Sequence, residues 1–269
     1  KSTTFIMKIA IIGAGAMGGA MAEGLLKSHV ISPSDITVAN PTAEKLEPFA
    51  QQGASVTTDN EAAAEDADII VIAVKPWIVE KVVNELKDTF DYRHQSIVVV
   101  AAGITSQQLC EWFDKGDGKL PALFLAIPNI AIAELQSMTF LVPVKADQKE
   151  TDTLNSLFNE LGQCLVTEER LLGAGTTLAS CGIAYAMRYV RAAVEGGVEL
   201  GFKANEAEKI VLQTVKGAVD LLQATGEHPE AAIDKVTTPG GVTIRGLNEM
   251  EHAGFSSAVI RGLKAGAKA

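Results

Sequence analysis

A glycine-rich stretch close to the start of the chain constrains its fold more than any other feature. Apart from Lys8, residues 8–12 are apolar and rich in isoleucine, which is typical of a strand buried on both faces of a sheet. Gly13, Gly15 and Gly18 follow in G-x-G-x-x-G spacing, and residues 17–26 are good helix formers. Strand, glycine turn and helix are the context in which this spacing binds a dinucleotide. The stretch therefore predicts the first βα unit of a nucleotide-binding sheet.

Each glycine has a separate physical role in this prediction. Gly13 permits a tight turn, Gly15 lets the backbone approach a pyrophosphate, and Gly18 lets helix and strand pack closely. The stretch can also be interpreted as a secretory signal with a small-residue site near residues 20–22. Glycines at this density disfavour the helical core of a signal, so we favour the dinucleotide interpretation. The cofactor-binding residues expected in this turn are Gly13, Ala14, Gly15, Ala16, Met17 and Gly18.

Net charge and residue usage limit the classes of partner. The formal net charge of −10 disfavours binding to nucleic acid or to anionic membrane surfaces. No run of 18 or more apolar residues occurs, so we expect no membrane span. Cys110, Cys164 and Cys181 lack the spacing of metal ligands. We expect reduced thiols, a cytoplasmic protein and no metal site.

Strand and helix patterns alternate along the first part of the chain and then give way to helices alone. Further strands are expected at residues 35–40, 55–57, 68–74, 96–101, 123–127, 139–144 and 164–167, and helices at 43–53, 61–65, 78–89, 106–113 and 151–161. This alternation predicts an α/β fold, a Rossmann-type doubly wound and largely parallel sheet, over residues 1–167. Residues 168–269 are expected to form an all-helical domain, with helices at 183–200, 205–225, 229–235, 243–252 and 255–267.

The first long helix of the second domain is unusually rich in small residues. They are Ala184, Ala186, Ala192, Ala193, Gly196 and Gly197. Such a surface allows close helix contact, and leaving it exposed would be a liability. We expect it to pair with a second subunit in a homodimer, although a central position within its own domain is the alternative.

The second expected strand ends in Asn40-Pro41-Thr42. NAD-selective sites usually place an Asp or Glu here, where it hydrogen-bonds the ribose 2′-hydroxyl. Asn40 and Thr42 can donate to a 2′-phosphate and do not repel it, and Lys45 lies one helical turn further on. We therefore expect NADP as cofactor with NADPH preferred, while Glu44 leaves NADH possible if it turns inward.

The ends of three later strands should face the same cleft, because ligands bind beyond the carboxyl ends of strands in open α/β sheets. The expected cofactor contacts are Ala73, Val74, Lys75, Pro76, Gly103 and Asn129. Lys75 could act on the cofactor or merely mark the exit of the strand. Asn129 could hold the loop, hold the nicotinamide, or be a plain loop residue.

The most specific stretch lies late in the chain, at residues 236–244. Two glycines after a proline leave backbone N–H groups at the start of a helix beginning near Thr243, which is a natural cradle for a carboxylate. A helix N-cap is the structural alternative for a threonine in this position. The expected substrate-binding residues are Thr238, Pro239, Gly240, Gly241, Val242 and Thr243.

Taken together, these motifs resemble the pyrroline-5-carboxylate reductase family over both domains. The motifs that carry the resemblance are Gly13-x-Gly15-x-Met17-Gly18, Val74-Lys75-Pro76, Ala102-Gly103-Ile104, Pro128-Asn129, and residues 236–244 followed by Gly246-Leu247. The resemblance implies NAD(P)H-dependent reduction of 1-pyrroline-5-carboxylate to L-proline, the last step of proline biosynthesis. It also implies an interlocked homodimer of the helical domains, often built into larger rings.

The reaction assigned by the resemblance needs hydride at carbon and a proton at nitrogen. The Pro-Gly-Gly amides would hold the substrate carboxylate, and Thr243 is the expected catalytic residue, bonding the imine nitrogen and relaying its proton. The chain departs from the family pattern at Ile127, where methionine is usual. It also reads Cys181-Gly182-Ile183 where the family has Ser-Gly-Pro.

Two other functions fit parts of the sequence. One is another two-domain NADP-dependent imine or hydroxyacid oxidoreductase. Hydroxyacid dehydrogenases of this plan generally place a catalytic lysine on the long interdomain helix, and residues 183–200 contain no lysine. The other is a non-catalytic NADP-binding regulator, which only the altered segment at Cys181 supports.

Overall fold

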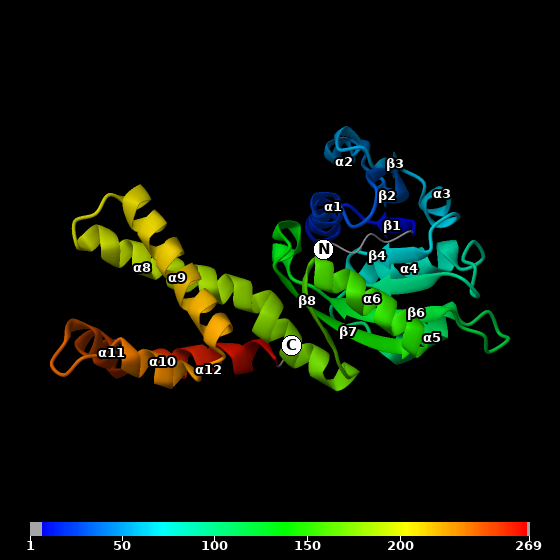
Figure 1. Cartoon of the computed structure of the whole chain (residues 1–269). Helices are drawn as coiled ribbons and strands as arrows, with labels where there is room; N and C mark the ends of the chain where they lie inside the picture. The colour runs from blue at the N-terminus through cyan, green and yellow to red at the C-terminus, as the bar shows by residue number, and fades with distance from the viewer. Residues whose placement is uncertain (1–6, 268–269) are drawn as a thin grey trace. The chain divides into compact units, whose positions relative to one another are not determined.

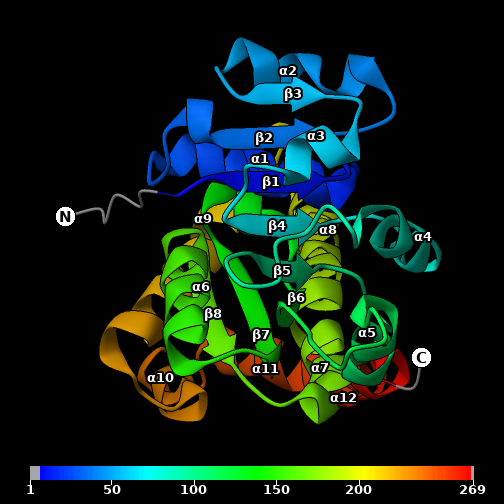
Figure 2. The ribbon, with the colours of Figure 1, turned by 90° about the vertical axis from the view of Figure 1, so that its right-hand side faces the viewer.

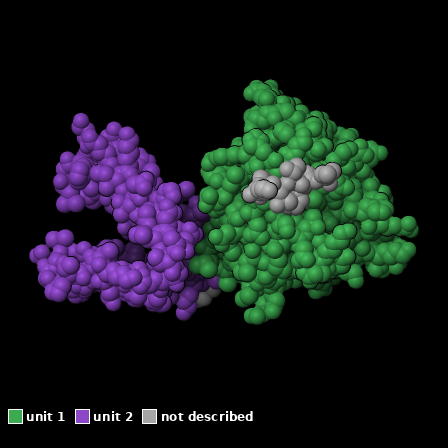
Figure 3. All heavy atoms as spheres, viewed as in Figure 1, with its two compact units in different colours: residues 1–180 green, residues 181–269 purple. Residues whose placement is uncertain are grey.

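The computed structural model describes residues 7–267. Backbone contacts divide the chain into two compact units, residues 1–180 and 181–269, which Figure 3 shows in green and purple. The boundary that the sequence places between residues 167 and 168 stays a prediction, since compactness alone does not define where a folding domain ends.

The first unit is built on one eight-stranded sheet with the order β3-β2-β1-β4-β5-β6-β7-β8 (Figures 1 and 2). Its strands are β1 (Ile9–Ile12), β2 (Ile36–Ala39), β3 (Ser55–Thr57), β4 (Ile69–Ile72), β5 (Ser96–Val99), β6 (Ala122–Ile127), β7 (Ser137–Lys145) and β8 (Gly162–Val166). All neighbours are parallel except β6 and β7, which run antiparallel. The doubly wound sheet expected from the sequence is confirmed, and the strand order reverses between β1 and β4.

Helices cover both faces of the sheet because its central strands are apolar on both sides. All four residues of β1 and of β4 are buried. One core cluster joins the sheet to α1 (Ala16–Ser28) and α6 (Gln148–Glu160). The other joins it to α3 (Asn60–Ala64), α4 (Pro76–Leu86) and α5 (Ser106–Phe113). Figure 2 shows α6 on one side of the sheet and α4 and α5 on the other.

Several short elements differ from the expected ones. The single helix expected over residues 43–53 is wrong: the structure has the 3₁₀ turn η2 (Ala43–Lys45) and then α2 (Glu47–Gln51). Pro48 stands in the first turn of α2, where its missing N–H costs nothing. The other short elements are η1 (Pro33–Asp35), η3 (Ile130–Glu134), η4 (Glu169–Leu171), α7 (Leu172–Gly175) and the π-helical turn η5 (Thr176–Ser180).

The second unit consists of helices in its described part, as the sequence predicts. They are α8 (Cys181–Glu199), α9 (Ala204–Thr225), α10 (Pro229–Lys235), α11 (Val242–His252) and α12 (Phe255–Gly266). Gly197 on α8 packs against Ala207 on α9, where an added Cβ would lie 2.9 Å from the alanine Cβ. Across the part of the chain that the structure describes, no helix is long and apolar enough to cross a membrane.

Candidate active site

The glycine turn after β1 has the geometry that its spacing predicts. Gly13 has φ of +105°, and a Cβ there would lie 2.6 Å from the Ala73 carbonyl oxygen. A Cβ on Gly18 would lie 1.8 Å from the Gly13 carbonyl oxygen, so only glycine allows α1 to approach the turn this closely. Gly15 faces open space, with nothing within 4 Å of an added Cβ. The turn is therefore closed on its protein side and open at Gly15.

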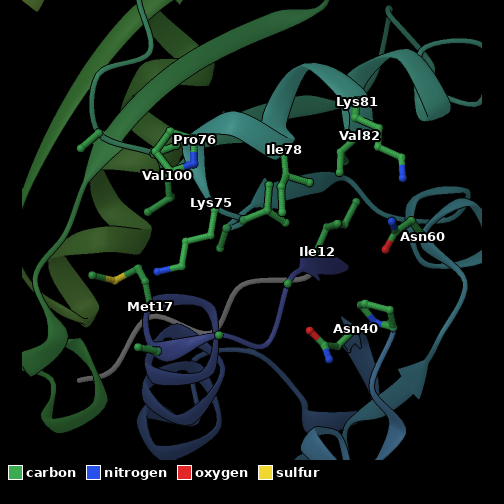
Figure 4. A pocket seen from close by; sticks show the side chains of 18 of the residues that line it. Ile12, Met17, Asn40, Asn60, Lys75, Pro76, Ile78, Lys81, Val82 and Val100 are labelled. Carbon is green, nitrogen blue, oxygen red and sulfur yellow. The ribbon is translucent and has the colours of Figure 1, made fainter.

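A pocket of about 790 Å³ opens in front of this turn (Figure 4). It lies at the carboxyl ends of four strands, because Ile12, Ala73, Val100 and Ile127 all line it. Its position at the reversal of strand order is where open α/β sheets bind ligands. Its volume falls within the range of about 300–1,000 Å³ that is usual for cofactor sites.

Most of the expected cofactor residues line this pocket. Those that do are Gly13, Gly15, Ala16, Met17, Asn40, Ala73, Val74, Lys75 and Pro76. Ala14, Gly18, Thr42, Gly103 and Asn129 are not among its lining residues. Gly18 packs against the turn from behind, and the Ala14 N–H donates to the Asn40 side chain.

The Asn40 amide already has two protein partners. Its Oδ1 accepts a hydrogen bond from the Ala14 N–H at 3.1 Å, and its Nδ2 donates to the Thr42 carbonyl oxygen at 3.2 Å. Asn40 is also buried, with 8% of its surface exposed. It therefore ties the end of β2 to the glycine turn. The strand end carries no acidic side chain, but the Asn40 amide is already largely occupied by its bonds to Ala14 and Thr42.

Asn129 is buried and does not line the pocket. Its Oδ1 accepts from the Ala131 N–H at 3.0 Å and so caps η3, while its backbone N–H donates to Ser137 Oγ at 3.1 Å. The preceding residue, Pro128, lines the pocket. Of the three sequence-based interpretations of Asn129, these contacts favour the one in which it holds the loop.

The segment 169–180 brings two polar residues to the pocket that the sequence did not indicate. Thr176 and Ser180 both line it. The segment is held to the sheet unit at both ends: Glu169 accepts hydrogen bonds from the Ser106 backbone N–H and hydroxyl, and Ser180 Oγ donates to the Pro128 carbonyl oxygen at 3.1 Å. These contacts join residues far apart in sequence, so no local pattern could have predicted them.

Other lining residues missed by sequence reasoning come from the loop after β3, from the start of α3 and from α4. They are Thr58, Asn60, Ile78, Lys81, Val82 and Glu85. Figure 4 shows Lys81 and Asn60 toward one end of the pocket and Lys75 and Met17 toward the other. Lys75 is exposed, lines the pocket, and is the N-cap residue of α4.

In the helical unit, residues 238–241 form the tight turn expected before α11. The Gly241 N–H donates to the Thr238 carbonyl oxygen at 2.9 Å, and Gly240 has φ of +72°. Proline second and a positive-φ glycine third are the pattern of a type II turn. This corrects one expectation: the Gly241 N–H serves the turn, and Pro239 has none. The N–H groups left for a ligand are those of Gly240 and the first turn of α11.

Thr243 is exposed and lies within the first turn of α11. The N-cap residue is Gly241, and no side chain caps this helix. The alternative role of Thr243 as N-cap is therefore wrong. Thr238 contributes to the turn by packing, since a Cβ on Gly241 would lie 2.4 Å from Thr238 Oγ1.

Among the described residues, no group of three or more His, Cys, Asp or Glu side chains could hold a metal ion. The polar groups that the pocket and the turn offer are lysine ammonium groups, hydroxyls, amides, backbone N–H groups and the Glu85 carboxylate.

Two family models match different parts of the chain. Residues 169–269 match the family model "Pyrroline-5-carboxylate reductase dimerisation", and residues 8–103 match "NADP oxidoreductase coenzyme F420-dependent". Pyrroline-5-carboxylate reductase 2 of Dictyostelium discoideum is 36% identical over 95% of this chain and 89% of its own length. Pyrroline-5-carboxylate reductase 1 of the same organism is 37% identical over 95% of this chain, which spans 48% of that protein.

The fold is shared with a solved structure of Plasmodium falciparum pyrroline carboxylate reductase with NADP bound. The TM-score is 0.87 at 24% identity, and the match covers 98% of this chain and 97% of that one.

Proposed function

The chain belongs to the pyrroline-5-carboxylate reductase family, and we propose that it reduces 1-pyrroline-5-carboxylate to L-proline with NADPH, the last step of proline biosynthesis. The observation that carries the proposal is the pocket at the glycine turn, which is open at Gly15 and placed where the strand order reverses. The turn at residues 238–241 supports it independently, because it offers backbone N–H groups suited to a carboxylate.

The pocket suits a dinucleotide for a stereochemical reason. Gly13 and Gly18 exclude any side chain on the protein side of the turn, while Gly15 leaves its ligand side bare. The start of α1 contributes N–H groups without a side-chain cap, where a pyrophosphate would bind. When bound, NADPH supplies the hydride. The solved Plasmodium relative has NADP bound.

We propose that the protein contributes position rather than strong acid catalysis. Reducing a cyclic imine requires hydride at carbon and a proton at nitrogen, and such an imine is basic enough to arrive partly protonated. The Gly240 N–H and the first turn of α11 would hold the carboxylate, and the Thr243 hydroxyl would bond the imine nitrogen and relay its proton. The exposed hydroxyl of Thr243 and the uncapped start of α11 support this assignment.

For the assembly, the helical unit matches a dimerisation family, and we propose a homodimer formed through it. Its exposed apolar side chains support this: Leu200, Leu221 and Val242 have 83%, 66% and 78% of their surface exposed. We also propose that the dimers assemble into a larger ring and that the protein is cytoplasmic. Three free thiols among the described residues support a reducing compartment.

The test is an NADPH-oxidation assay with the purified full-length chain and pyrroline-5-carboxylate, with proline identified as the product. The six-membered cyclic imine and NADH are run in parallel, and a 2-hydroxy acid with NADP⁺ is the control for the alternative oxidoreductase. We expect proline formation that is faster with NADPH than with NADH. NADPH binding without turnover of any imine would instead indicate a non-catalytic regulator.

A further inference from the structure

One end of the pocket contains two lysines from different elements. Lys45 is the last residue of η2, which follows β2 and Asn40 along the chain. Lys81 lies in the middle of α4. Both line the pocket. In Figure 4 the Lys81 ammonium group extends toward Asn60 and away from Lys75. In the same view Lys81 and Asn40 both lie on the side of the pocket away from Lys75, and a sheet of this type places the adenosine ribose at the strand end that Asn40 follows.

Neither lysine is neutralised by the protein. Within the described part of the chain, the ammonium groups of Lys45 and Lys81 have no ion-pair or hydrogen-bond partner. The pocket is lined by three lysines, the third being Lys75, and by Glu85 as its one described carboxylate. Three positive charges against one negative charge give a formal +2 in a chain whose net charge is −10. The pocket is therefore a local site for an anion.

The residues expected from the sequence to receive a 2′-phosphate are less suited to it than these lysines. The Asn40 amide is engaged by Ala14 and Thr42, and Thr42 does not line the pocket. The strand end therefore omits the repelling acid and leaves one Asn40 Nδ2 hydrogen for a ligand. The side chains of Thr58 and Asn60 line the same pocket and add a hydroxyl and an amide.

We propose that Lys81 is a specificity-determining residue that selects NADPH over NADH by binding the 2′-phosphate, with Lys45 as the second cation. The inference rests on the proposed use of NADP(H). Lysine binds phosphate as a point charge, and a charge-assisted contact is stronger than a neutral hydrogen bond. Lys81 lies within the helix that the sequence predicts at residues 78–89 and not at a strand end, which is why the strand-end rule alone does not identify it.

The experiment measures dissociation constants of the purified full-length protein for NADP⁺ and NAD⁺ by titration calorimetry. The variants are Lys81→Met, Lys45→Met, Lys81→Arg and, as matched control, Lys149→Met. Lys149 is also exposed, lies on α6 and does not line the pocket. Methionine keeps the helix propensity and the length of the stem while removing the charge. Melting temperatures confirm that each variant is folded.

We expect Lys81→Met to weaken NADP⁺ binding about five- to tenfold, the range for a partly exposed charged contact, and to change NAD⁺ binding less than about twofold. Lys81→Arg should retain most of the affinity, and Lys149→Met should match the wild type. The slope of log Kd against log salt should become shallower for NADP⁺ in Lys81→Met, because one charge contact is lost.

If Lys81→Met weakened the binding of NADP⁺ and NAD⁺ equally, the proposal would be overturned, since the lysine would then contact a group that both dinucleotides carry. An unchanged NADP⁺ affinity would overturn it as well. These titrations need no imine substrate. A protein that shows the expected selectivity but forms no proline would leave this inference intact and reject only the proposed reaction, whereas a wild type that binds neither dinucleotide would reject both.

Discussion

The two compact units differ sharply in how much of their apolar surface they bury. The sheet unit has a buried cluster on each face of its sheet. Among the described residues of the helical unit, Ala207 is the one buried apolar residue. Large side chains such as Met187 on α8 and Leu221 on α9 remain 63% and 66% exposed.

This difference indicates two ways of completing a core. The sheet unit obtains its apolar contacts from its own chain, because helices from α1 to α6 cover both faces. The helical unit presents apolar faces that a second copy of the chain would cover, as in obligate dimers whose interface resembles a core cut in half. The first unit should therefore be sensitive to internal packing, and the second to changes on its surface.

The largest effect should come from placing charges on the apolar surface of the helical unit. In the double variant Met187→Asp and Leu221→Asp, dimerisation would have to bury unpaired carboxylates, at a cost of about 3–5 kcal/mol or more. Light scattering should show monomers at micromolar concentration, and proline formation should be largely lost. Lys209→Asp, an exposed position on the same helix α9, is the control and should leave the dimer intact. A double variant that remains a dimer would contradict the view that a second copy of the chain covers these apolar side chains.

A large effect is also expected at Gly18, inside the sheet unit. In Gly18→Ala the added Cβ would lie 1.8 Å from the Gly13 carbonyl oxygen, so α1 must move away from the turn. We expect a loss of about 3 kcal/mol in the free energy of unfolding, measured by urea denaturation, together with loss of NADPH binding.

The neighbouring glycine provides a matched control for this prediction. Gly19→Ala meets only the Phe49 ring at 3.7 Å, which is ordinary contact. Its stability should therefore rise by up to about 1 kcal/mol, the helix-propensity gain of alanine over glycine. If Gly18→Ala and Gly19→Ala had the same free energy of unfolding, the close approach of α1 to the turn at Gly18 would not be needed for stability.

A smaller effect, confined to catalysis, is expected at Thr243. Thr243→Ala should lower kcat/KM about ten- to a hundredfold, because a hydrogen bond to a charged group contributes roughly 1.5–3 kcal/mol. Its NADPH affinity and melting temperature should change little, since the cap of α11 is Gly241 and not Thr243.

Thr243→Ser keeps the hydroxyl and should keep most of the activity. Normal turnover in Thr243→Ala would remove this hydroxyl from the mechanism and leave the backbone N–H groups as the sole contribution of the turn.

The smallest effect concerns Cys164, on β8 at the edge of the sheet. Burial raises the pKa of its thiol from 9.0 to about 12. The folded state therefore keeps a proton that the unfolded state loses, so the thiol's contribution to stability is complete below pH 9 and is lost as the pH rises toward 12. The urea midpoint should fall less steeply with pH above pH 9 in Cys164→Ala than in the wild type. Identical slopes would indicate that Cys164 titrates normally in the folded protein.

Local pattern alone predicted much of this protein. The isoleucine-rich strand at residues 9–12, the glycine turn and α1 follow from short-range properties: β-branched side chains, glycine's freedom at positive φ, and helix propensity. The turn before α11 belongs to the same class, because proline followed by glycine encodes its geometry within four residues. The order of strands and helices then favours a doubly wound sheet, since parallel neighbours need helical crossovers.

Tertiary structure decided what depends on residues that meet across the fold. It turned β7 antiparallel to β6, and it divided the expected helix at 43–53 into η2 and α2, which begins at Glu47. It also brought Lys81, Asn60 and Ser180 to a pocket whose glycine turn lies far from them in sequence, and it engaged the Asn40 amide with the glycine turn. Propensity and periodicity act over a few residues, whereas a binding site is lined by whichever side chains the packed sheet brings to its carboxyl edge.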